Sequence, residues 1–261
     1  MDLPRLDHLH LDLTDGILTL TLDRPERLNA INHPLHQSIA RAFDFACDCE
    51  EARVVVLTGA GRAFSAGGDM AEISSSVDEF ARESAYGRKI VQRMVDCDKP
   101  IICRLNGDAI GLGASLVLLS DIVVAARGAR IGDPHVRMGL VAGDGGALIW
   151  PMHAGLMAAK YYLLTGDLLP ADEAKALGLI TFVVEPEELD ARTAAIAAKL
   201  AAGAPLAIRW TKRAINAAVA HALPTVFDQS LAYEGLSMMS EDHAEAKAAF
   251  LAKRKPVFRG R

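Results

Sequence analysis

The sequence predicts an α/β fold built as a spiral of similar units, and three observations support this prediction. Two strands of buried character run into glycine-rich turns and then into helix-forming segments, within residues 54–72 and 100–119. This order of strand, turn and helix recurs with a spacing of roughly 45 residues, which is too irregular for a sequence repeat but as expected for a spiral of similar units. After residue 203 no strand pattern remains. We therefore expect a core over residues 1–200 and a helical region over 201–261.

The composition is that of a globular protein with a large core. Of 261 residues, 51% are hydrophobic, and the mean hydropathy is +0.19. The formal net charge of -5 argues against a general nucleic-acid binder. Met1–Leu13 carries three aspartates and no apolar core of a signal peptide, and no apolar run has the length of a membrane span. We expect a cytoplasmic protein without a membrane partner.

The cysteines do not have the spacing of a metal site. Cys47 and Cys49 are separated by one residue and lack a neighbouring pair of histidines, and Cys97 and Cys103 stand apart from them. We interpret all four as buried, reduced thiols and expect no bound metal.

The remaining elements follow from local patterns of apolar, glycine and proline residues. In order, we expect strands at 8–13 and 17–22 around an Asp-Gly turn, a helix from about 34 to 49, a strand at 54–58 and a surface helix or mobile cover at 77–95. We then expect strands at 100–105, 121–126 and 129–132, a helix at 115–119 and an apolar helix after 143–146. The chain ends with core segments at 164–166, 171–177 and 181–184 and with helices over 206–252.

The stretch Arg62–Glu72 is the first candidate binding site. Gly67 and Gly68 have no Cβ, so a backbone N–H there can lie directly against a ligand atom. A helix beginning at Asp69 would add the positive end of its dipole. Such a turn suits an oxyanion. The alternative is an ordinary strand-to-helix turn that needs glycine only for its backbone conformation.

Six segments in order resemble the enoyl-CoA hydratase/isomerase (crotonase) family over essentially the whole chain. They are Asp23-Arg24-Pro25 with Asn29-Ala30, the stretch 62–72, Lys99-Pro100 with Asn106-Gly107, Ser120-Asp121-Ile122, Leu163 to Gly166, and the tail from Glu241 to Pro256. The resemblance implies a spiral of ββα units, a helical C-terminal region that builds trimers or dimers of trimers, and a coenzyme A thioester as substrate. It implies no cofactor beyond the coenzyme A of that substrate.

The resemblance also implies an oxyanion hole made of two backbone N–H groups, those of Gly68 and Leu112. A thioester carbonyl that becomes an enolate needs donors aimed at its oxygen, and each is worth about 2.7 to 4 kcal/mol. A main-chain donor tolerates the Leu112 side chain, although relatives usually have glycine there. The alternative for Leu112 is a core leucine without a role.

The resemblance also implies which residues contact the nucleotide part of the ligand. A lysine beside a phosphate is physically sensible, although tail lysines are more often merely solvated. The residues implied are Arg27, Ala66, Gly68, Asp69, Met70 and, from a neighbouring subunit, Phe250 and Lys253. Candidates to shape the acyl pocket are Met70, Tyr86, Ile90, Met138 and Trp150.

The chain departs from the family at the catalytic positions. Hydratases of the family carry two glutamates where this chain has Ser115 and His135. Hydration needs one group to deprotonate water and another to protonate the α-carbon, and Ser115 does neither at neutral pH. His135 can do so, with Asp133 to orient its imidazole, unless Pro134 spoils that geometry. A purely structural His135 is the alternative.

Asp144 is the other candidate acid or base, because related isomerases and dehalogenases place an aspartate one position away. Its alternative role is to cap the following helix. Together these residues predict an acyl-CoA enzyme that stabilises a thioester enolate, with isomerisation or hydrolysis of a C–C bond favoured over hydration. The rival hypothesis is a non-catalytic acyl-CoA-binding protein.

Overall fold

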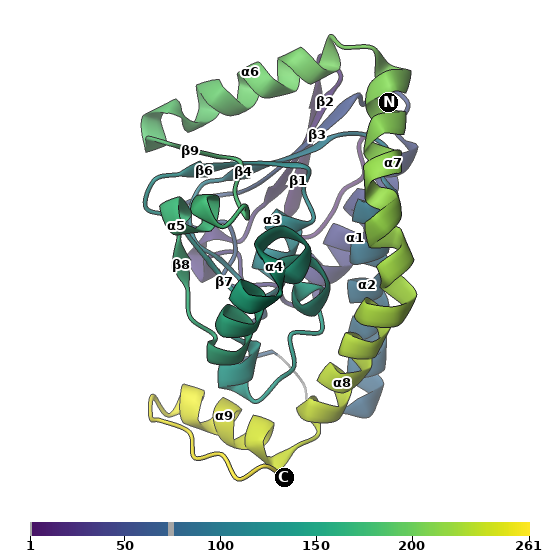
Figure 1. Ribbon diagram of the computed structural model, residues 1–261. Coiled ribbons are helices and arrows are strands. Elements are labelled where there is room, and N and C mark those ends of the chain that lie inside the picture. Colours follow the sequence, from purple (N-terminus) through teal and green to yellow (C-terminus); the bar gives the residue numbers. More distant parts are fainter. Residues whose placement is uncertain (1, 73–75) are drawn as a thin grey trace.

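A twisted six-stranded sheet forms the centre of the protein, and helices surround it (Figure 1). The computed structural model describes residues 2–72 and 76–261. The strands are β1 (Leu9–Thr14), β2 (Ile17–Leu22), β3 (Val54–Gly59), β4 (Ile101–Leu105), β5 (Ala109–Ile110), β6 (Ile122–Ala126), β7 (Arg130–Gly132), β8 (Leu169–Pro170) and β9 (Phe182–Val184). The α-helices are α1 (His33–Asp48), α2 (Val77–Asp96), α3 (Leu112–Leu118), α4 (Gly146–Thr165), α5 (Ala171–Ala176), α6 (Leu189–Ala201), α7 (Pro205–Ala222), α8 (Asp228–Met238) and α9 (Glu241–Leu251).

The large sheet has the strand order β1-β2-β3-β4-β6-β9. β1 and β2 form the predicted antiparallel hairpin, and every later pair in this sheet is parallel. All six residues of β3 are buried, as expected for a parallel strand covered on both faces. The α/β spiral core predicted from the sequence is confirmed.

A second sheet has the order β5-β7-β8 and is the one that positions the site. β5 pairs with β7 in parallel, so the ends of both strands reach the same edge. β5 ends at Ile110, directly before the turn into α3, and β7 ends at Gly132, directly before Asp133. Two stretches separated by about twenty residues are thereby brought together.

Two predicted helix starts are wrong. The helix expected from Ser115 begins three residues earlier, at Leu112, because Gly111 adopts a φ of 54° and starts the helix itself. The helix expected from Asp69 is absent from the described residues, where 70–72 form a turn and α2 begins at Val77. The helix dipole that we expected beside Gly68 is therefore not supplied by a helix that begins at Asp69.

The C-terminal region is helical, as predicted. α7 and α8 are joined by a short π-helical segment, Leu223–Phe227, and run down one side of the molecule to α9 (Figure 1). Among the described residues no single helix is both long enough and apolar enough to span a membrane. The pair Pro186–Ala201 and Pro205–Met238, bent by 107°, reaches those criteria only when taken together.

Candidate active site

Two glycine-containing turns lie against each other at the end of the small sheet. The N–H of Ile110 donates to the carbonyl of Ser65 at 2.9 Å, and Ser65 forms a bridge with Ala109. A Cβ on Gly67 would lie 2.9 Å from the carbonyl oxygen of Ile110. Gly67, with a φ of 84°, is therefore required both for its conformation and for this close approach.

The two N–H groups predicted as an oxyanion hole belong to these turns. Gly68 is exposed, and Leu112 is the first residue of α3. Neither N–H has an acceptor within residues 2–72 and 76–261. At Leu112 the start of a helix supplies free N–H groups and a positive dipole end. The Leu112 side chain, 8% exposed, packs in the core while its N–H stays available.

A buried asparagine fixes the turn that carries Gly68. The amide of Asn29 donates to the carbonyls of Ala60 and Ala63, both at 2.9 Å. The N–H of Asp69 donates to Ile31, and its carboxylate pairs with Arg24 at 2.6 Å. Burial of Asp69 favours its protonated form, but the hydrogen bond and charge of Arg24 dominate and lower its pKa. Asp69 thus has an internal partner.

Asp133 and His135 are joined as predicted. Asp133 Oδ1 accepts a hydrogen bond from the His135 Nδ1, and the His135 backbone N–H lies 3.4 Å from the same oxygen. Pro134 does not spoil this geometry. A short 3₁₀ turn begins at His135, and the imidazole ring of His135 lies back against Asp133. The ring lies beside the oxyanion turn, where a Cβ on Gly111 would be 3.4 Å from His135 Cε1.

Asp144 faces the other ring nitrogen of His135. Its Oδ2 lies 3.4 Å from His135 Nε2, and its Oδ1 accepts a hydrogen bond from Ser115 Oγ at 2.9 Å. The alternative role as a helix cap is wrong, since Gly145 is the N-cap residue of α4 and the cap has no side-chain bond. Ser115 therefore positions Asp144.

Glu234 on α8 is a fourth member of the cluster that was not predicted from the sequence. Its Oε1 lies 3.9 Å from His135 Nε2, and the residue is only 8% exposed. Helical spacing places Glu234 on the side of α8 with Ser230, which is also buried. A glutamate inside an apolar helical pattern was the only available signal, and it cannot show which distant loop the carboxylate meets.

The loop 143–146 closes over this cluster because its glycines leave room for two carboxylates. A Cβ on Gly146 would lie 2.0 Å from Asp133 Oδ2, and one on Gly143 would lie 2.5 Å from Glu234 Oε2. Any side chain at either position would displace an acidic group from the cluster.

The cluster holds protons more tightly than its members would in water. Burial alone would lower the pKa of His135, but the charges of Asp133 and Asp144 outweigh it and raise the pKa well above 6.5. Burial raises the pKa of Asp144, against the opposing charge of His135. Burial likewise raises the pKa of Glu234 to about 8, although the charge of His135 acts in the opposite direction. At neutral pH His135 and Glu234 therefore both carry a proton.

Asp133, His135 and Asp144 could also hold a cation. One ligand atom of each lies within 4.8 Å of the others. In this arrangement the imidazolium of His135 occupies the centre of the acidic groups and supplies the positive charge itself. The expectation of no metal stays a prediction.

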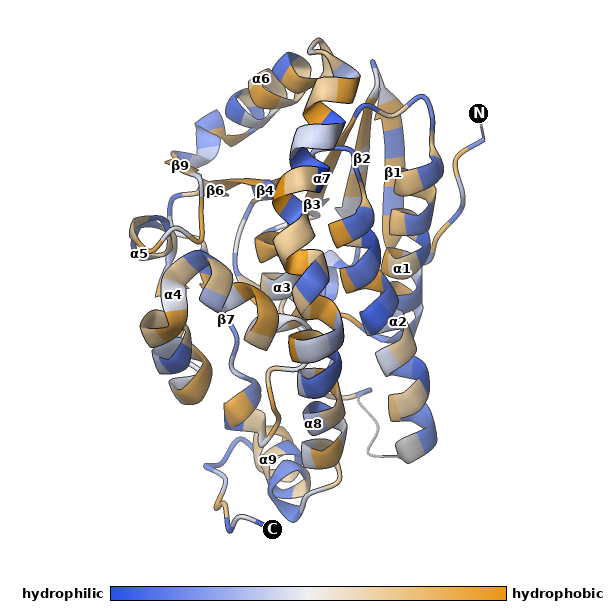
Figure 2. Cartoon of the chain, turned by 45° about the vertical axis from the view of Figure 1, so that its right-hand side comes forward, coloured by the Kyte–Doolittle hydropathy of each residue, from blue (hydrophilic) through white to orange (hydrophobic). Residues whose placement is uncertain are grey.

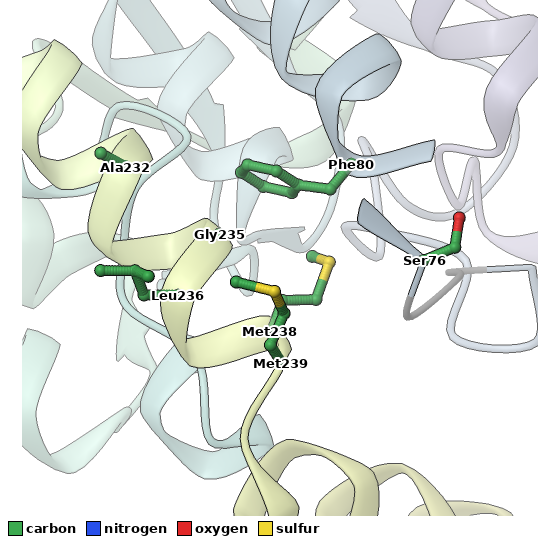
Figure 3. A pocket seen from close by; sticks show the side chains of 7 residues that line it. All are labelled: Ser76, Phe80, Ala232, Gly235, Leu236, Met238 and Met239. Atoms are coloured by element: carbon green, nitrogen blue, oxygen red, sulfur yellow. The ribbon is translucent and has the colours of Figure 1, made fainter. Parts of the chain in front are cut away.

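An apolar cavity of about 170 Å³ opens between α2 and α8 (Figure 3). It is lined by Ser76, Phe80, Ala232, Gly235, Leu236, Met238 and Met239. Gly235 lines the cavity and faces Phe80, whereas its neighbour Glu234 lies against Gly143, so α8 contributes to both the cavity and the acidic cluster. None of the five residues suggested for an acyl pocket lines it, and Ile90 and Trp150 are fully buried in the core.

The residues implied for coenzyme A lie in two places. Arg27 is exposed near the glycine turn, where Ala66 bonds the carbonyl of Leu28. Phe250 and Lys253 are exposed at the end of α9. Their contact with coenzyme A stays a prediction, as does that of Gly68 and Met70.

Comparisons with known proteins agree with this architecture. The family model for enoyl-CoA hydratase/isomerase matches residues 12–261. A 1,2-epoxyphenylacetyl-CoA isomerase of Escherichia coli is 37% identical over 253 residues, covering 94% of this chain and 96% of the relative. A solved enoyl-CoA hydratase/isomerase from Mycobacterium paratuberculosis is 40% identical with a TM-score of 0.89, covering 95% of this chain and 99% of that one.

A third relative has a different activity in its description. It is a β-diketone hydrolase from the cyanobacterium Anabaena, solved with bound (S)-3-oxocyclohexyl acetic acid, 28% identical with a TM-score of 0.85. The match covers 92% of this chain and 98% of that one. The match of the family model, the identities and the shared fold together show that this chain belongs to the enoyl-CoA hydratase/isomerase (crotonase) family.

Proposed function

We propose that the protein is an acyl-CoA isomerase that forms a thioester enolate. The observation that carries this proposal is the cluster around His135, which lies beside the two unpaired N–H groups of Gly68 and Leu112. The N–H groups of Gly68 and Leu112 would bind the thioester oxygen as it becomes negative. The reaction needs no cofactor beyond the coenzyme A of its substrate.

Proton transfer falls to His135 and Asp144. Asp144 Oδ2 faces His135 Nε2 at 3.4 Å, so one proton can move between the two side chains. Burial raises the pKa of Asp144, which makes it a stronger base than an ordinary aspartate, and Asp144 takes a proton from the α-carbon. His135, which is protonated at neutral pH, returns a proton to the enolate at another carbon. Asp133 keeps the imidazole in place.

The cavity between α2 and α8 is the proposed place of the acyl chain. It lies beside α8, the helix that carries Glu234, and is lined mainly by Phe, Leu and Met side chains. A pocket of this composition suits an aliphatic or ring-bearing acyl group.

Exchange of α-protons tests the enolate step without knowledge of the natural substrate. Butyryl-CoA in D₂O should gain deuterium at its α-carbon in the presence of the protein, as followed by mass spectrometry. His135→Ala and Asp144→Asn should each slow the exchange by roughly 10²- to 10⁴-fold, because each removes a positioned acid or base. Binding of coenzyme A should stay unchanged. Equal exchange by both variants and the parent would refute the assigned roles.

Hydrolysis of a C–C bond in a β-dicarbonyl is the second candidate reaction, favoured by the buried His–carboxylate cluster and by the β-diketone hydrolase among the relatives. Water would add to one carbonyl, the C–C bond would break, and its electron pair would form an enolate that His135 protonates. Incubation with cyclic 1,3-diketones decides between the candidates. Release of a keto acid favours hydrolysis, whereas α-exchange with acyl-CoA alone favours the isomerase.

A further inference from the structure

Two histidines of α1 share one carboxylate of α2. His33 Nδ1 contacts Glu83 Oε1, and His36 Nδ1 lies 2.7 Å from Glu83 Oε2. The two histidines differ in exposure, because the His33 side chain is 53% exposed and the His36 side chain only 12%. Only His36 therefore faces the interior.

The far edge of the His36 ring is buried without a partner. Its Nε2 is inaccessible to solvent and has no hydrogen-bond partner in the part of the chain that the structure describes. Gly87 of α2 faces this edge, and a Cβ there would be 3.7 Å from Nε2, an ordinary contact that offers no hydrogen bond. Buried polar atoms are nearly always paired in native proteins, so an unpaired one requires an explanation.

This edge of His36 lies within electrostatic range of the acidic cluster. The charge of His36 is close enough to act on the carboxyl group of Asp144. One helical turn after Gly87, Val91 lies against the loop beside Asp144, where a Cβ on Gly145 would be 3.7 Å from its Cγ2. α2 thus connects the free edge of His36 to the loop that carries Asp144.

We propose that His36 is a specificity-determining residue, whose Nε2 forms a hydrogen bond with an oxygen atom on the acyl chain beyond the α-carbon, as in a 3-oxo or 3-hydroxyacyl thioester. This proposal rests on the proposed acyl-CoA function. It adds a substrate class to that function.

The Glu83–His36 pair is suited to this task. Glu83 accepts the proton of Nδ1, which fixes the ring and leaves Nε2 for the ligand. A charged ring donates to a ketone, and a neutral ring accepts from a hydroxyl group. An acyl chain without that oxygen would leave Nε2 buried and unpaired, so the site discriminates against such a chain.

Calorimetric titration of two leucine variants tests the proposal. His36→Leu keeps an apolar side chain of similar volume, and His33→Leu is the matched control because His33 contacts the same Glu83. His36→Leu should bind acetoacetyl-CoA and 3-hydroxybutyryl-CoA about tenfold more weakly, as expected for one lost hydrogen bond. Its affinity for butyryl-CoA and for coenzyme A should match the parent. His33→Leu should bind all four ligands as the parent does.

The outcomes separate the two proposals. If His36→Leu binds acetoacetyl-CoA as the parent does, or loses equal affinity for butyryl-CoA, the role of His36 is refuted but the acyl-CoA function is not. A parent protein that binds neither coenzyme A nor any of its thioesters refutes the acyl-CoA function and this inference with it. Glu83→Gln provides a second variant, which should weaken acetoacetyl-CoA binding without affecting butyryl-CoA.

Discussion

Three carboxyl groups meet around His135, and the number of protons that these four side chains hold determines their chemistry. His135 and Glu234 carry protons at neutral pH: burial opposes the charged imidazole of His135, but the charges of Asp133 and Asp144 raise its pKa, and burial raises the pKa of Glu234. Asp133 holds one side of the imidazole and Asp144 the other. This arrangement is the basis of the proton transfer that we propose for the cluster.

The unmodified protein should hydrate crotonyl-CoA far more slowly than family members with two catalytic glutamates. Ser115 occupies one glutamate position, and its hydroxyl is used to hold Asp144. Each positioned acid or base contributes roughly 10²- to 10⁴-fold, so the rate should be lower by at least that factor. Loss of absorbance of the enoyl thioester measures it. Rapid hydration would show that Asp144 or Glu234 positions the water.

Restoring a glutamate at Ser115 should not create a hydratase. Ser115 is fully buried, and its Oγ lies 3.3 Å from the place of a Cβ on Gly145. A longer acidic side chain would collide with the loop and add charge beside Asp144. Ser115→Glu should lower the melting temperature without raising hydration, whereas Ser115→Ala should keep the fold. A stable, hydrating Ser115→Glu protein would contradict this geometry.

Glu234 should make the protein less stable as the pH rises. Its pKa is raised from 4.5 to about 8, so folding favours its protonated form. The stability from this group is complete below pH 4.5 and is lost as the pH rises through about 8. Each pKa unit corresponds to about 1.4 kcal/mol. Glu234→Gln should therefore melt at a higher temperature than the parent at pH 9, with a smaller difference at pH 5. Parallel melting curves for both proteins across this range would contradict a buried, protonated Glu234.

At the scale of the elements, the loop before α4 and the helix α8 close the site together. Gly143 lies against Glu234 of α8, and Gly146, the first residue of α4, lies against Asp133. These contacts join the C-terminal helices to the core at the catalytic cluster. The site spans the boundary predicted at residue 200, because Glu234 lies after that boundary and His135 lies before it.

Gly146→Ala should destabilise the protein, because the new methyl group would lie 2.0 Å from Asp133 Oδ2. Overpacking of this kind costs roughly 1–3 kcal/mol. Gly87→Ala is the comparison, since it lies inside α2 and its methyl group would make an ordinary contact at 3.7 Å. That variant should be more stable by about 0.5–1 kcal/mol. Urea unfolding of both variants measures the two effects, and equal shifts would contradict the assigned contact.

At the scale of the molecule, apolar side chains remain exposed on α4 and α7, where apolar residues recur in Figure 2. On α4 they include Met157, 84% exposed, and Leu164, 72% exposed. On α7 they include Trp210 and Ile215. Surfaces of this kind mark contacts with other molecules.

We expect a trimer or a hexamer in solution, because symmetric association of identical chains would bury these side chains. Light scattering over a wide concentration range measures the mass. Leu164→Lys with Met157→Lys should shift the protein toward smaller species, whereas lysine at exposed Glu173 should not. A monomeric parent at all concentrations would overturn the expectation.

The sequence by itself determined most of the elements and their order, because these depend on local patterns, but it did not predict β5 or α6. The Asp15-Gly16 turn, the apolar run of β3 and the Ala- and Leu-rich helices after residue 203 all appear as predicted. The pairing of Asp133 with His135 was also predictable, since only Pro134 separates them in the sequence. The start of α3 was not, because it depends on the backbone of Gly111 in a turn fixed by β5 and β7.

Only the tertiary structure decided which distant groups meet. Glu234 reaches His135 because α8 packs over the loop 143–146, and His36 comes within electrostatic range of Asp144 through the packing of α1 on α2. Ser115 holds Asp144 because α3 lies beside the start of α4. Such contacts arise from burial, which acts between segments far apart in the chain, whereas sequence patterns report only the preference of each segment for its own conformation.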